Sequence, residues 1–465
     1  MRIDEIDLRE LTNSFEFFIK EGQEARLRHL LISMHPSDIA AIINRIGKDE
    51  NRLYLFNLLD KEVASDTILK IDEAVREDLI EMLEQDLLTD IVDEMESDDA
   101  TDFISELPEE IAKDVLENVE QEDAEEVKQL MQHREDTAGG IMALEIVSVN
   151  KNATVDEAIL EIRKKAEEIE EIYNVFVVDD ANKLVGQLSM KALILASGQK
   201  PIAEIMEKDV ASVHVDMDQE EVANYARKYD LVSVPVVDDD YHLLGRITID
   251  DIMDVIEEEA SEDLQRMAGI ADEEELREPS SFRIVRGRIP WLIFGLVGGL
   301  WGAEVIKLFE GQLAKVHILA IFIPIILSMG GNIGMQSSAI VVRGLATGEI
   351  DVKDVYKRIF RELKVSLING IVLGILLFVY AFIRMDVQGG GSHSSTILPL
   401  ELGAVVGVSL LTVILVAGFV GTTVPLLLKK VKIDPALATG PFITTSNDII
   451  ALFIYFAMAT LFLNI

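Results

Sequence analysis

The chain has 465 residues, of which 83 are acidic and 42 are basic, giving a formal net charge of -41. This excess of acid excludes a nucleic-acid binder held by phosphate contacts, because such a protein needs a basic face. The absence of cysteine excludes disulfides, zinc–thiolate sites, iron–sulfur clusters and thiol nucleophiles.

The charge is divided very unevenly along the chain. From Ile284 to the end there are 10 acidic and 14 basic residues, which leaves 73 acidic and 28 basic residues before that point. The first ten residues, MRIDEIDLRE, are acidic and have no apolar core, so we expect no cleavable signal peptide. An acidic, cytosolic first part is therefore expected to precede an apolar last part.

A twelve-residue repeat runs through residues 1–134. Its best copies are the consecutive segments MESDDATDFISE, LPEEIAKDVLEN and VEQEDAEEVKQL, which cover residues 95–130. Leu107, Ile111, Val115 and Val119 are spaced to share one helix face. One short helix per period predicts a superhelical stack, because each helix is too small to be stable alone. Most of its carboxylates are expected to form a solvated surface.

A second repeat has a period of 59 residues. VFVVDDANKLVGQLSMKA (175–192) aligns without gaps with VPVVDDDYHLLGRITIDD (234–251). The order strand–helix–strand–strand–helix, used twice, resembles a pair of cystathionine-β-synthase-type (CBS) domains, here residues 135–200 and 201–259. In that family a Thr or Ser three residues before an Asp often holds a nucleotide ribose.

The second CBS copy carries this pattern as Thr248 and Asp251, whereas the first has Ser189 and Ala192. ATP or another adenine nucleotide is therefore expected to favour the second copy. A plain helix cap at Thr248 is the alternative, because Thr before two aspartates is a common N-cap sequence.

An acidic helix is expected to connect the CBS pair to the membrane, over residues 260–285. Like charges one turn apart destabilise a helix by ~0.2–0.5 kcal/mol per pair, so a divalent cation with oxygen ligands is the natural neighbour of such a run. The candidate metal ligands of this region are Asp251, Asp254, Glu258, Glu259, Glu262 and Asp263. A plain acidic linker is the alternative.

The last part, residues 286–465, contains five apolar runs long enough to cross a bilayer. They are expected at Ile289–Phe309, His317–Val342, Leu363–Ile383, Leu398–Leu428 and Leu437–Leu463. Lys and Arg gather before the first run, between the second and third, and between the fourth and fifth, which predicts a cytosolic N-terminus and an outer C-terminus. Buried core helices of a soluble protein are the alternative.

The second span contains the segment FIPIILSMGGNIGMQSSA (322–339). Its proline, glycines and polar residues predict broken backbone that lines a cavity, with Asn332 as an oxygen ligand. The alternative is that Gly330, Gly331 and Gly334 allow another helix to approach closely.

The fifth span carries Asp448 near the middle of its apolar run. An unpaired acid at that depth costs roughly 2.5–3.5 kcal/mol on insertion scales, so such residues usually face water, ions or partners. A cation site is therefore favoured over a protonated, structural aspartate.

The whole chain resembles the MgtE family of bacterial magnesium channels. The resemblance rests on the domain order and on the motifs EDTAGGIM (135–142), PIILSMGGNIGMQ (324–336) and DPALATGPFITTSND (434–448). It implies a homodimer whose pore lies on the two-fold axis, with Asp448 binding hydrated Mg²⁺; Asp434 opens the last motif and is a further candidate ligand. Many relatives carry Asn where this chain has Gly440, which removes a side-chain oxygen near the pore.

The expected protein is thus a multidomain membrane protein: a helical repeat domain, an α/β tandem CBS pair, an acidic connecting helix and a five-helix transmembrane domain. No HExxH, GxSxG or P-loop motif favours an enzyme. The expected function is Mg²⁺ uptake through a channel embedded in lipid of the bacterial inner membrane and gated by cytosolic Mg²⁺. The alternatives are a broader Mn²⁺ or Co²⁺ transporter and a membrane-anchored metal sensor.

Overall fold

The structure is a computed structural model that describes residues 5–166, 169, 171–270, 281–350, 355–388 and 398–463. The described residues form two compact units, divided after Glu257. The first unit contains the helical repeat and the CBS pair, and the second contains the end of the connecting helix and the membrane helices.

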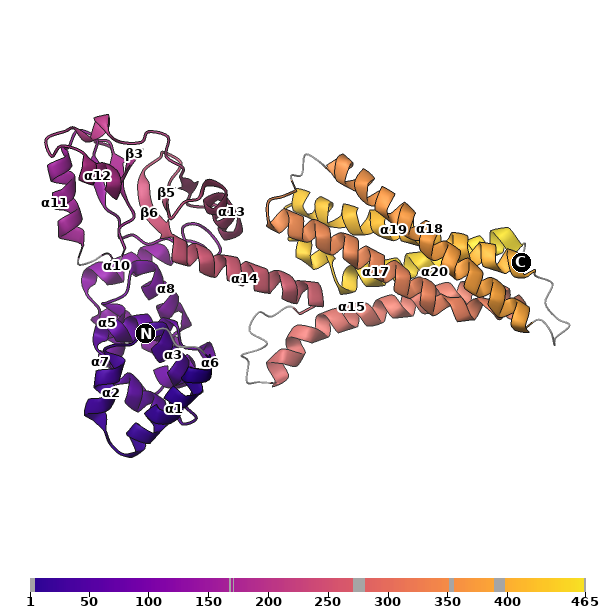
Figure 1. The fold of residues 1–465 in the computed structure, drawn as a ribbon, viewed down its shortest axis with the longest axis horizontal. Coiled ribbons are helices and arrows are strands. Elements are labelled where there is room, and N and C mark those ends of the chain that lie inside the picture. Colours follow the sequence, from indigo (N-terminus) through magenta and orange to yellow (C-terminus); the bar gives the residue numbers. More distant parts are fainter. Residues whose placement is uncertain are drawn as a thin grey trace. The chain divides into compact units, whose positions relative to one another are not determined.

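The twelve-residue repeat forms a chain of short helices, as predicted (Figure 1). After α1 (Glu5–Lys20), nine helices begin twelve or thirteen residues apart. They are α2 (Glu24–Leu31), α3 (Pro36–Arg45), α4 (Asp49–Phe56), α5 (Lys61–Leu69), α6 (Glu73–Ile80), α7 (Gln85–Val92), α8 (Ser97–Glu106), α9 (Glu109–Asn118) and α10 (Gln121–Leu130). Leu107, Val115 and Val119 are buried and Ile111 packs against the same core, which confirms the predicted apolar face.

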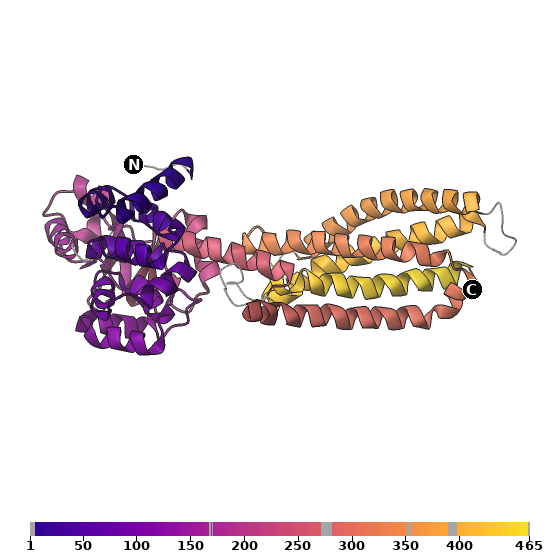
Figure 2. The same ribbon diagram turned by 90° about the horizontal axis from the view of Figure 1, so that it is seen from below.

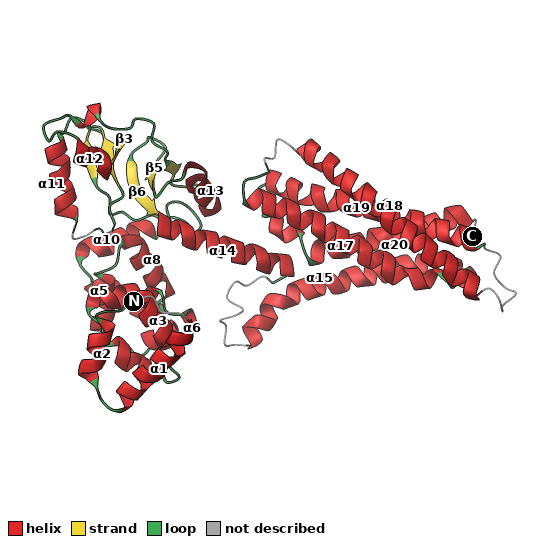
Figure 3. Ribbon diagram, in the orientation of Figure 1, coloured by secondary structure: helices red, strands yellow, loops and turns green. Residues whose placement is uncertain are grey.

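Two three-stranded sheets follow, one in each CBS domain (Figure 3). In each sheet the first and second strands are parallel, and the second and third are antiparallel. Both sheets shift register after equivalent residues, Val177 and Val236, which are one 59-residue period apart. The first domain comprises β1 (Ser148–Asn150), α11 (Val155–Lys165), β2 (Asn174–Val178), β3 (Leu184–Ser189) and α12 (Met190–Leu195). The second comprises β4 (Val213–His214), α13 (Gln219–Tyr229), β5 (Ser233–Val237), β6 (Leu243–Thr248) and the start of α14 (Ile249–Ala268).

Helix α14 is the connecting helix, and it carries the acidic residues from Asp250 to Asp263 on one helical stretch, as predicted. Ile252 and Val255 in its first turns are buried in the core of the second CBS domain. The expected boundary between residues 259 and 260 therefore falls inside one continuous helix. The expected helix also included residues 271–280, which lie outside the described residues.

Five helices of the second unit are long and apolar enough to cross a membrane, as predicted (Figure 2). They are α15 (Ser281–Leu308), α17 (Leu319–Ala346), α18 (Val355–Gln388), α19 (Pro399–Lys430) and α20 (Pro441–Leu463). The short helix α16 (Glu310–Lys315) joins the first two, and the 3₁₀ turn η4 (Pro435–Ala438) precedes the last.

Two expectations about these spans are wrong. The second span is not broken: α17 is a continuous helix, and Pro324 lies close enough to its start that the ring disturbs little more than the first turn. The fifth span starts at Pro441 rather than Leu437, because η4 and Gly440, with a φ of +55°, interrupt the chain before the helix. Asp448 is consequently closer to the start of its helix than expected.

Helices α17, α19 and α20 pack against one another, while α18 packs on α19 and α15 on α20. The hydroxyl of Tyr455 on α20 donates a 2.9 Å hydrogen bond to the carbonyl oxygen of Leu319 on α17. Near the middle of α17, its glycines allow the close contacts with α20 described next.

Candidate functional site

The glycines of α17 form a notch that receives α20. A Cβ atom at Gly330 would lie 2.9 Å from Cγ1 of Val413 on α19 and 3.6 Å from Cβ of Ala451 on α20. One at Gly331 would lie 3.3 Å from Cγ2 of Thr444 on α20. At Gly334 it would lie only 1.8 Å from Nδ2 of Asn447. Any larger residue at Gly334 would collide with α20, so close helix approach, the alternative that the sequence left open, is what the glycines provide.

Asp448 lies over this notch. Its Oδ1 is 3.8 Å from the position that a Cβ atom of Gly331 would take, and its side chain is half-buried. Among the described residues, no Lys or Arg forms an ion pair with this carboxylate. Asn332 and Gln336, on α17, have exposed side chains in the single chain. The packing therefore fixes the carboxylate of Asp448 beside α17 without neutralising it.

The end of α14 makes a second set of polar contacts within the membrane unit. Arg266 donates a 2.5 Å hydrogen bond from Nη1 to Oδ2 of Asp434 and forms an ion pair with Glu262. The other carboxylate oxygen of Asp434 accepts a 2.8 Å hydrogen bond from the backbone N–H of Ala436, which caps η4. Burial and the negative charge of Asp434 raise the pKa of Asp263 to about 6.

These contacts bring several predicted metal ligands into one region. Glu262 and Asp434 share Arg266, and Asp263 experiences the charges of Asp434 and Glu259. Glu258 precedes them on α14, with an exposed side chain. Arg266 is a cation that the sequence analysis did not assign to this site, and its guanidinium offsets part of the acidic charge.

Gly440 is where α14 meets the start of α20. A Cβ atom at Gly440 would lie 2.2 Å from the carbonyl oxygen of Met267, and one at Gly269 would lie 2.6 Å from Cγ of Pro441. Together with its positive φ, this contact requires glycine at position 440. The residue that the sequence analysis read as a missing oxygen ligand thus provides the space in which the connecting helix ends.

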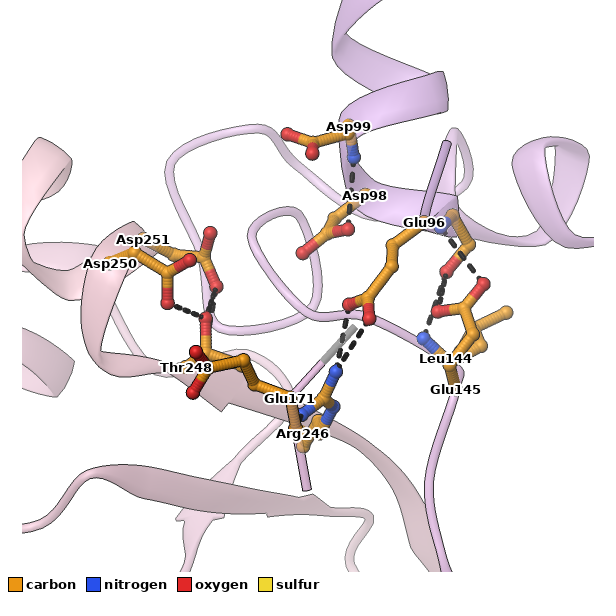
Figure 4. Close-up of polar contacts among 11 residues, drawn as sticks. Glu96, Asp98, Asp99, Leu144, Glu145, Glu171, Arg246, Thr248, Asp250 and Asp251 are labelled. Atoms are coloured by element: carbon orange, nitrogen blue, oxygen red, sulfur yellow. Dashed lines mark hydrogen bonds and ion pairs between the residues drawn. The ribbon is translucent and has the colours of Figure 1, made fainter. Parts of the chain in front are cut away.

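A buried acidic cluster lies in the first unit, where α8 faces the second CBS domain (Figure 4). Asp98 is only 8% exposed, and Asp99 follows it at the start of α8. Burial raises the pKa of Asp98 well above its ordinary value, and the nearby charge of Asp251 raises it further. The same two causes raise the pKa of Asp99 to about 7. Bringing these carboxylates together costs free energy unless protons or cations accompany them.

Thr248 connects this cluster to α14. Its hydroxyl donates to the carboxylates of Asp250 and Asp251, and its backbone N–H donates a 3.0 Å hydrogen bond to Asp251. Asp251 thus accepts from the backbone N–H of the residue before α14, which is one half of a capping box, while the hydroxyl of Thr248 donates to carboxylates and does not cap the helix. Asp254, one turn later, has a pKa raised by partial burial, an effect that the charge of Lys70 opposes.

One buried arginine connects the helical repeat to both CBS domains beside the acidic cluster. Arg246 is 4% exposed and donates 2.8 Å hydrogen bonds from Nη2 to both carboxylate oxygens of Glu96, and a 2.6 Å bond from Nη1 to the carbonyl of Glu171. Glu145 accepts 2.9 Å hydrogen bonds from the backbone N–H and the hydroxyl of Ser97 (Figure 4). The helical repeat is therefore attached to the CBS pair by polar contacts immediately beside the acidic cluster.

A small pocket of about 10 Å³, roughly the room of one water molecule, lies next to these contacts. Its lining includes the aromatic residues Tyr173 and Phe176 together with Asn174, Glu145 and Arg246. The pocket is far smaller than the clefts that hold small-molecule ligands, so as it stands it has no room for a heterocycle.

Across the described part of the chain, no three His, Asp or Glu side chains are arranged closely enough to form a metal site as they stand. Four residues of this region were not predicted from the sequence: Asp98, Asp99, Glu96 and Arg246. The segment MESDDATDFISE contained the signal, because two aspartates directly after the serine that opens α8 depart from the other copies.

Comparison with known proteins gives the same division of the chain. Residues 323–458 match the family model of the MgtE divalent cation transporter, residues 34–136 match the MgtE intracellular N domain, and residues 138–198 and 202–258 match CBS domains. The magnesium transporter MgtE of Thermus thermophilus is 35% identical over 460 residues, which is 98% of this chain and 99% of the relative. The chain belongs to the MgtE family.

Other relatives agree with this membership. The magnesium transporter MgtE of Enterococcus faecalis is 40% identical over 337 residues, 72% of this chain and 71% of that protein. Among solved structures, the soluble part of a magnesium transporter is 34% identical with a TM-score of 0.50 and covers 54% of this chain and 99% of its own. The cytosolic domain of the Mg²⁺ channel MgtE in complex with ATP is 33% identical with a TM-score of 0.50 and covers 52% of this chain and 99% of its own. The chain therefore belongs to a family of divalent cation transporters, whose function is transport and not enzymatic catalysis.

Proposed function

We propose that the chain forms a homodimeric, Mg²⁺-selective channel of the bacterial inner membrane, with a cytosolic N-terminus and a gate controlled by cytosolic Mg²⁺. The observation that supports it best is the carboxylate of Asp448, which is held over the glycines of α17 with no basic partner among the described residues. An intramembrane acid in such a place marks an ion pathway in preference to a structural contact.

The chemistry of Mg²⁺ suits this site. Mg²⁺ releases its water slowly and prefers octahedral oxygen coordination, so a pore that binds the hydrated ion avoids full dehydration. A two-fold axis would bring two copies of Asp448 together and double the negative charge. Asn332 would add an amide oxygen from each α17. Conduction requires binding strong enough to admit the ion and weak enough to release it.

For gating, we propose two groups of Mg²⁺ sites, one near each end of α14, in which the ion is shared between neighbouring carboxylates. At one end are Asp98, Asp251 and Asp254; at the other are Glu258, Glu259, Glu262, Asp263 and Asp434. At low Mg²⁺ these groups repel one another and loosen the connecting helix. At millimolar Mg²⁺, shared weak sites draw them together and hold the gate shut, because oxygen sites of ~10⁻⁴–10⁻³ M respond in the range of an abundant cytosolic ion.

Ion flux into dye-loaded liposomes tests the transport proposal. We expect uptake of Mg²⁺ in preference to Mn²⁺, Co²⁺ and Ca²⁺. Equal uptake of all four ions would favour a broad divalent-cation transporter, and no flux of any of them would favour a membrane-anchored sensor.

The gating proposal is tested by open probability against cytosolic Mg²⁺ in patch-clamp recordings. The intact chain is compared with one that starts at Ser281 and with a variant that neutralises Glu258, Glu259, Glu262 and Asp263 together. Both altered channels are expected to resist closure. If they close at the same Mg²⁺ concentration as the intact chain, the acidic region is not the sensor.

We also propose that the CBS pair binds an adenine nucleotide, since an MgtE cytosolic domain has been solved in complex with ATP. Thr248 and Asp251 are the candidates from the sequence, and Tyr173, an aromatic residue beside the small pocket, is the nearby group to compare with them. Calorimetric titration of ATP into the Thr248→Ala and Tyr173→Ala variants separates them, because the variant at the true site loses affinity while the other keeps it.

A further inference from the structure

Asn447 is a polar residue that the transport proposal does not yet use. Its side chain is only 2% exposed, on the part of α20 that packs against α17. Neither Oδ1 nor Nδ2 has a hydrogen-bond partner among the residues that the structure describes. An unsatisfied amide is costly in a buried apolar setting, so a purely structural role would be served better by a leucine of similar size.

The amide points at a close helix crossing of the bundle. Its Nδ2 lies 1.8 Å from the place that a Cβ atom of Gly334 would occupy. From the other side, a Cβ atom at Gly421 on α19 would lie 2.4 Å from the carbonyl oxygen of Gly334. Three helices therefore meet at Gly334, and Asn447 fills the space that the missing side chain leaves.

This crossing is directly coupled to Asp448. Asn447 packs at Gly334, and Asp448 packs at Gly331 one turn earlier on the same face of α17. Any rotation of α20 about its axis moves the amide and the carboxylate together. A directional interaction at Asn447 would consequently fix where the carboxylate of Asp448 points.

We propose that Asn447 is a positioning residue for Asp448, and that its amide binds a buried water between α17 and α20. An amide can donate two hydrogen bonds and accept two, and a buried water is the smallest group that supplies partners where the protein does not. The proposal rests on the proposed role of Asp448 in ion passage, and it adds a second polar residue behind the ion site.

The main test is Asn447→Leu in the full-length channel, measured by Mg²⁺ flux into liposomes. The expected result is a half-saturating Mg²⁺ concentration raised about fivefold, the equivalent of one net hydrogen bond, with a reduced preference for Mg²⁺ over Ca²⁺. The melting temperature should stay the same or rise, because leucine is of similar size and needs no polar partner in the buried contact. Wild-type half-saturation and selectivity in this variant would overturn the proposal.

Two further variants locate the effect. Gly334→Ala places a methyl group where the amide lies, so it should reproduce the transport defect of Asn447→Leu; a wild-type Gly334→Ala channel would overturn the placement. Ser409→Ala is the matched control, because Ser409 is 0% exposed on α19 and its hydroxyl also lacks a described partner. It is expected to leave half-saturation and selectivity unchanged, and an equal defect there would show a general packing effect.

A high-resolution map of the full-length protein gives the direct test. Density for a water within hydrogen-bond distance of the Asn447 amide supports the proposal, and an empty, dry contact contradicts it. Failure of the transport proposal itself is recognised separately: the wild-type chain would then carry no Mg²⁺, or Asp448→Ala would conduct normally.

Discussion

The two units of the molecule hold their acidic residues in opposite ways. In the first unit, Asp98, Asp99 and Asp251 are gathered at one contact between the helical repeat and the CBS pair, and burial and mutual repulsion raise their pKa values. Among the membrane-spanning helices of the second unit, the carboxylate of Asp448 lies on a face of glycine and small residues. The first arrangement responds to the supply of protons and cations, whereas the second depends on helix geometry.

Replacing Asp448 by Ala tests the membrane side of this comparison most severely. We expect Mg²⁺ flux to fall at least about 100-fold, because removing a charged ligand from a desolvated site costs several kcal/mol. Asp448→Asn should keep weak, unselective passage, since it retains an oxygen but loses the charge. Liposome flux measures both variants, with size-exclusion chromatography to check that they remain folded. Selective, wild-type flux through the Ala variant would remove Asp448 from the pathway.

Neutralising the cluster on the cytosolic side should remove a response and leave transport intact. In the double variant Asp98→Asn, Asp251→Asn, docking of the helical repeat no longer requires a cation. In the absence of Mg²⁺, α8 of the double variant should be protected from hydrogen exchange about tenfold more than α8 of the wild-type chain. This factor lies in the lower part of the range that typical coupling free energies give. Adding Mg²⁺ should then change little. A double variant that still needs Mg²⁺ for protection would show that the cation acts elsewhere.

The same cluster predicts a pH dependence in the absence of Mg²⁺. The pKa of Asp99 in the folded chain, about 7, is above its ordinary value, so protonation stabilises the docked state. That contribution is complete below the ordinary pKa and is lost as the pH rises through about 7. Protection of α8, corrected for intrinsic exchange, should fall by up to about tenfold between pH 6 and pH 8, at 1.36 kcal/mol per pKa unit. Millimolar Mg²⁺ should suppress this fall, and an unchanged slope with Mg²⁺ would contradict the shared site.

The parts of this comparison were not equally visible in the sequence. The twelve-residue and 59-residue repeats predicted the helical stack and both CBS sheets, because regular burial leaves a regular pattern of apolar residues. The five membrane spans followed from length and hydropathy for the same reason. Only local details failed: α17 is unbroken, and α20 begins after Gly440.

The cation sites were harder to predict because they depend on contacts between distant segments. Asp98 and Asp251 are separated by more than 150 positions, and nothing in either segment alone indicates that they meet. Arg246 has the same difficulty, since its partner Glu96 lies in the other repeat. Gly440 was noticed for the wrong reason: its lack of a side chain accommodates Met267, a contact that only the folded chain reveals.

Gly440→Ala sharpens the comparison at the point where the connecting helix ends. The new Cβ atom would meet the carbonyl of Met267 and would also require a left-handed backbone, which costs about 1–2 kcal/mol for a residue other than glycine. The docked position of α14 is destabilised, so closure should require about fivefold more cytosolic Mg²⁺. Patch-clamp recordings measure this shift. Gly348→Ala is the control, because Gly348 also has a positive φ but has open space around its Cα.

Arg266→Gln is expected to have the smallest effect. It tests whether the guanidinium of Arg266 offsets part of the acidic charge at the end of α14. Arg266 binds Asp434 and Glu262 at the end of α14, where the proposed Mg²⁺ site lies. Because this ion pair is partly exposed, its contribution is at most about 1 kcal/mol, so closure should need about twofold more Mg²⁺. The dependence on Mg²⁺ should also become steeper, since the metal alone must then offset Asp263, Glu262 and Asp434. Lys307→Gln is the matched control, because it removes the same charge from an exposed pair with Glu304 on α15. If the Arg266→Gln and Lys307→Gln channels close at the same Mg²⁺ concentration, the guanidinium does not contribute to closure. The acidic residues around it then depend on Mg²⁺ alone.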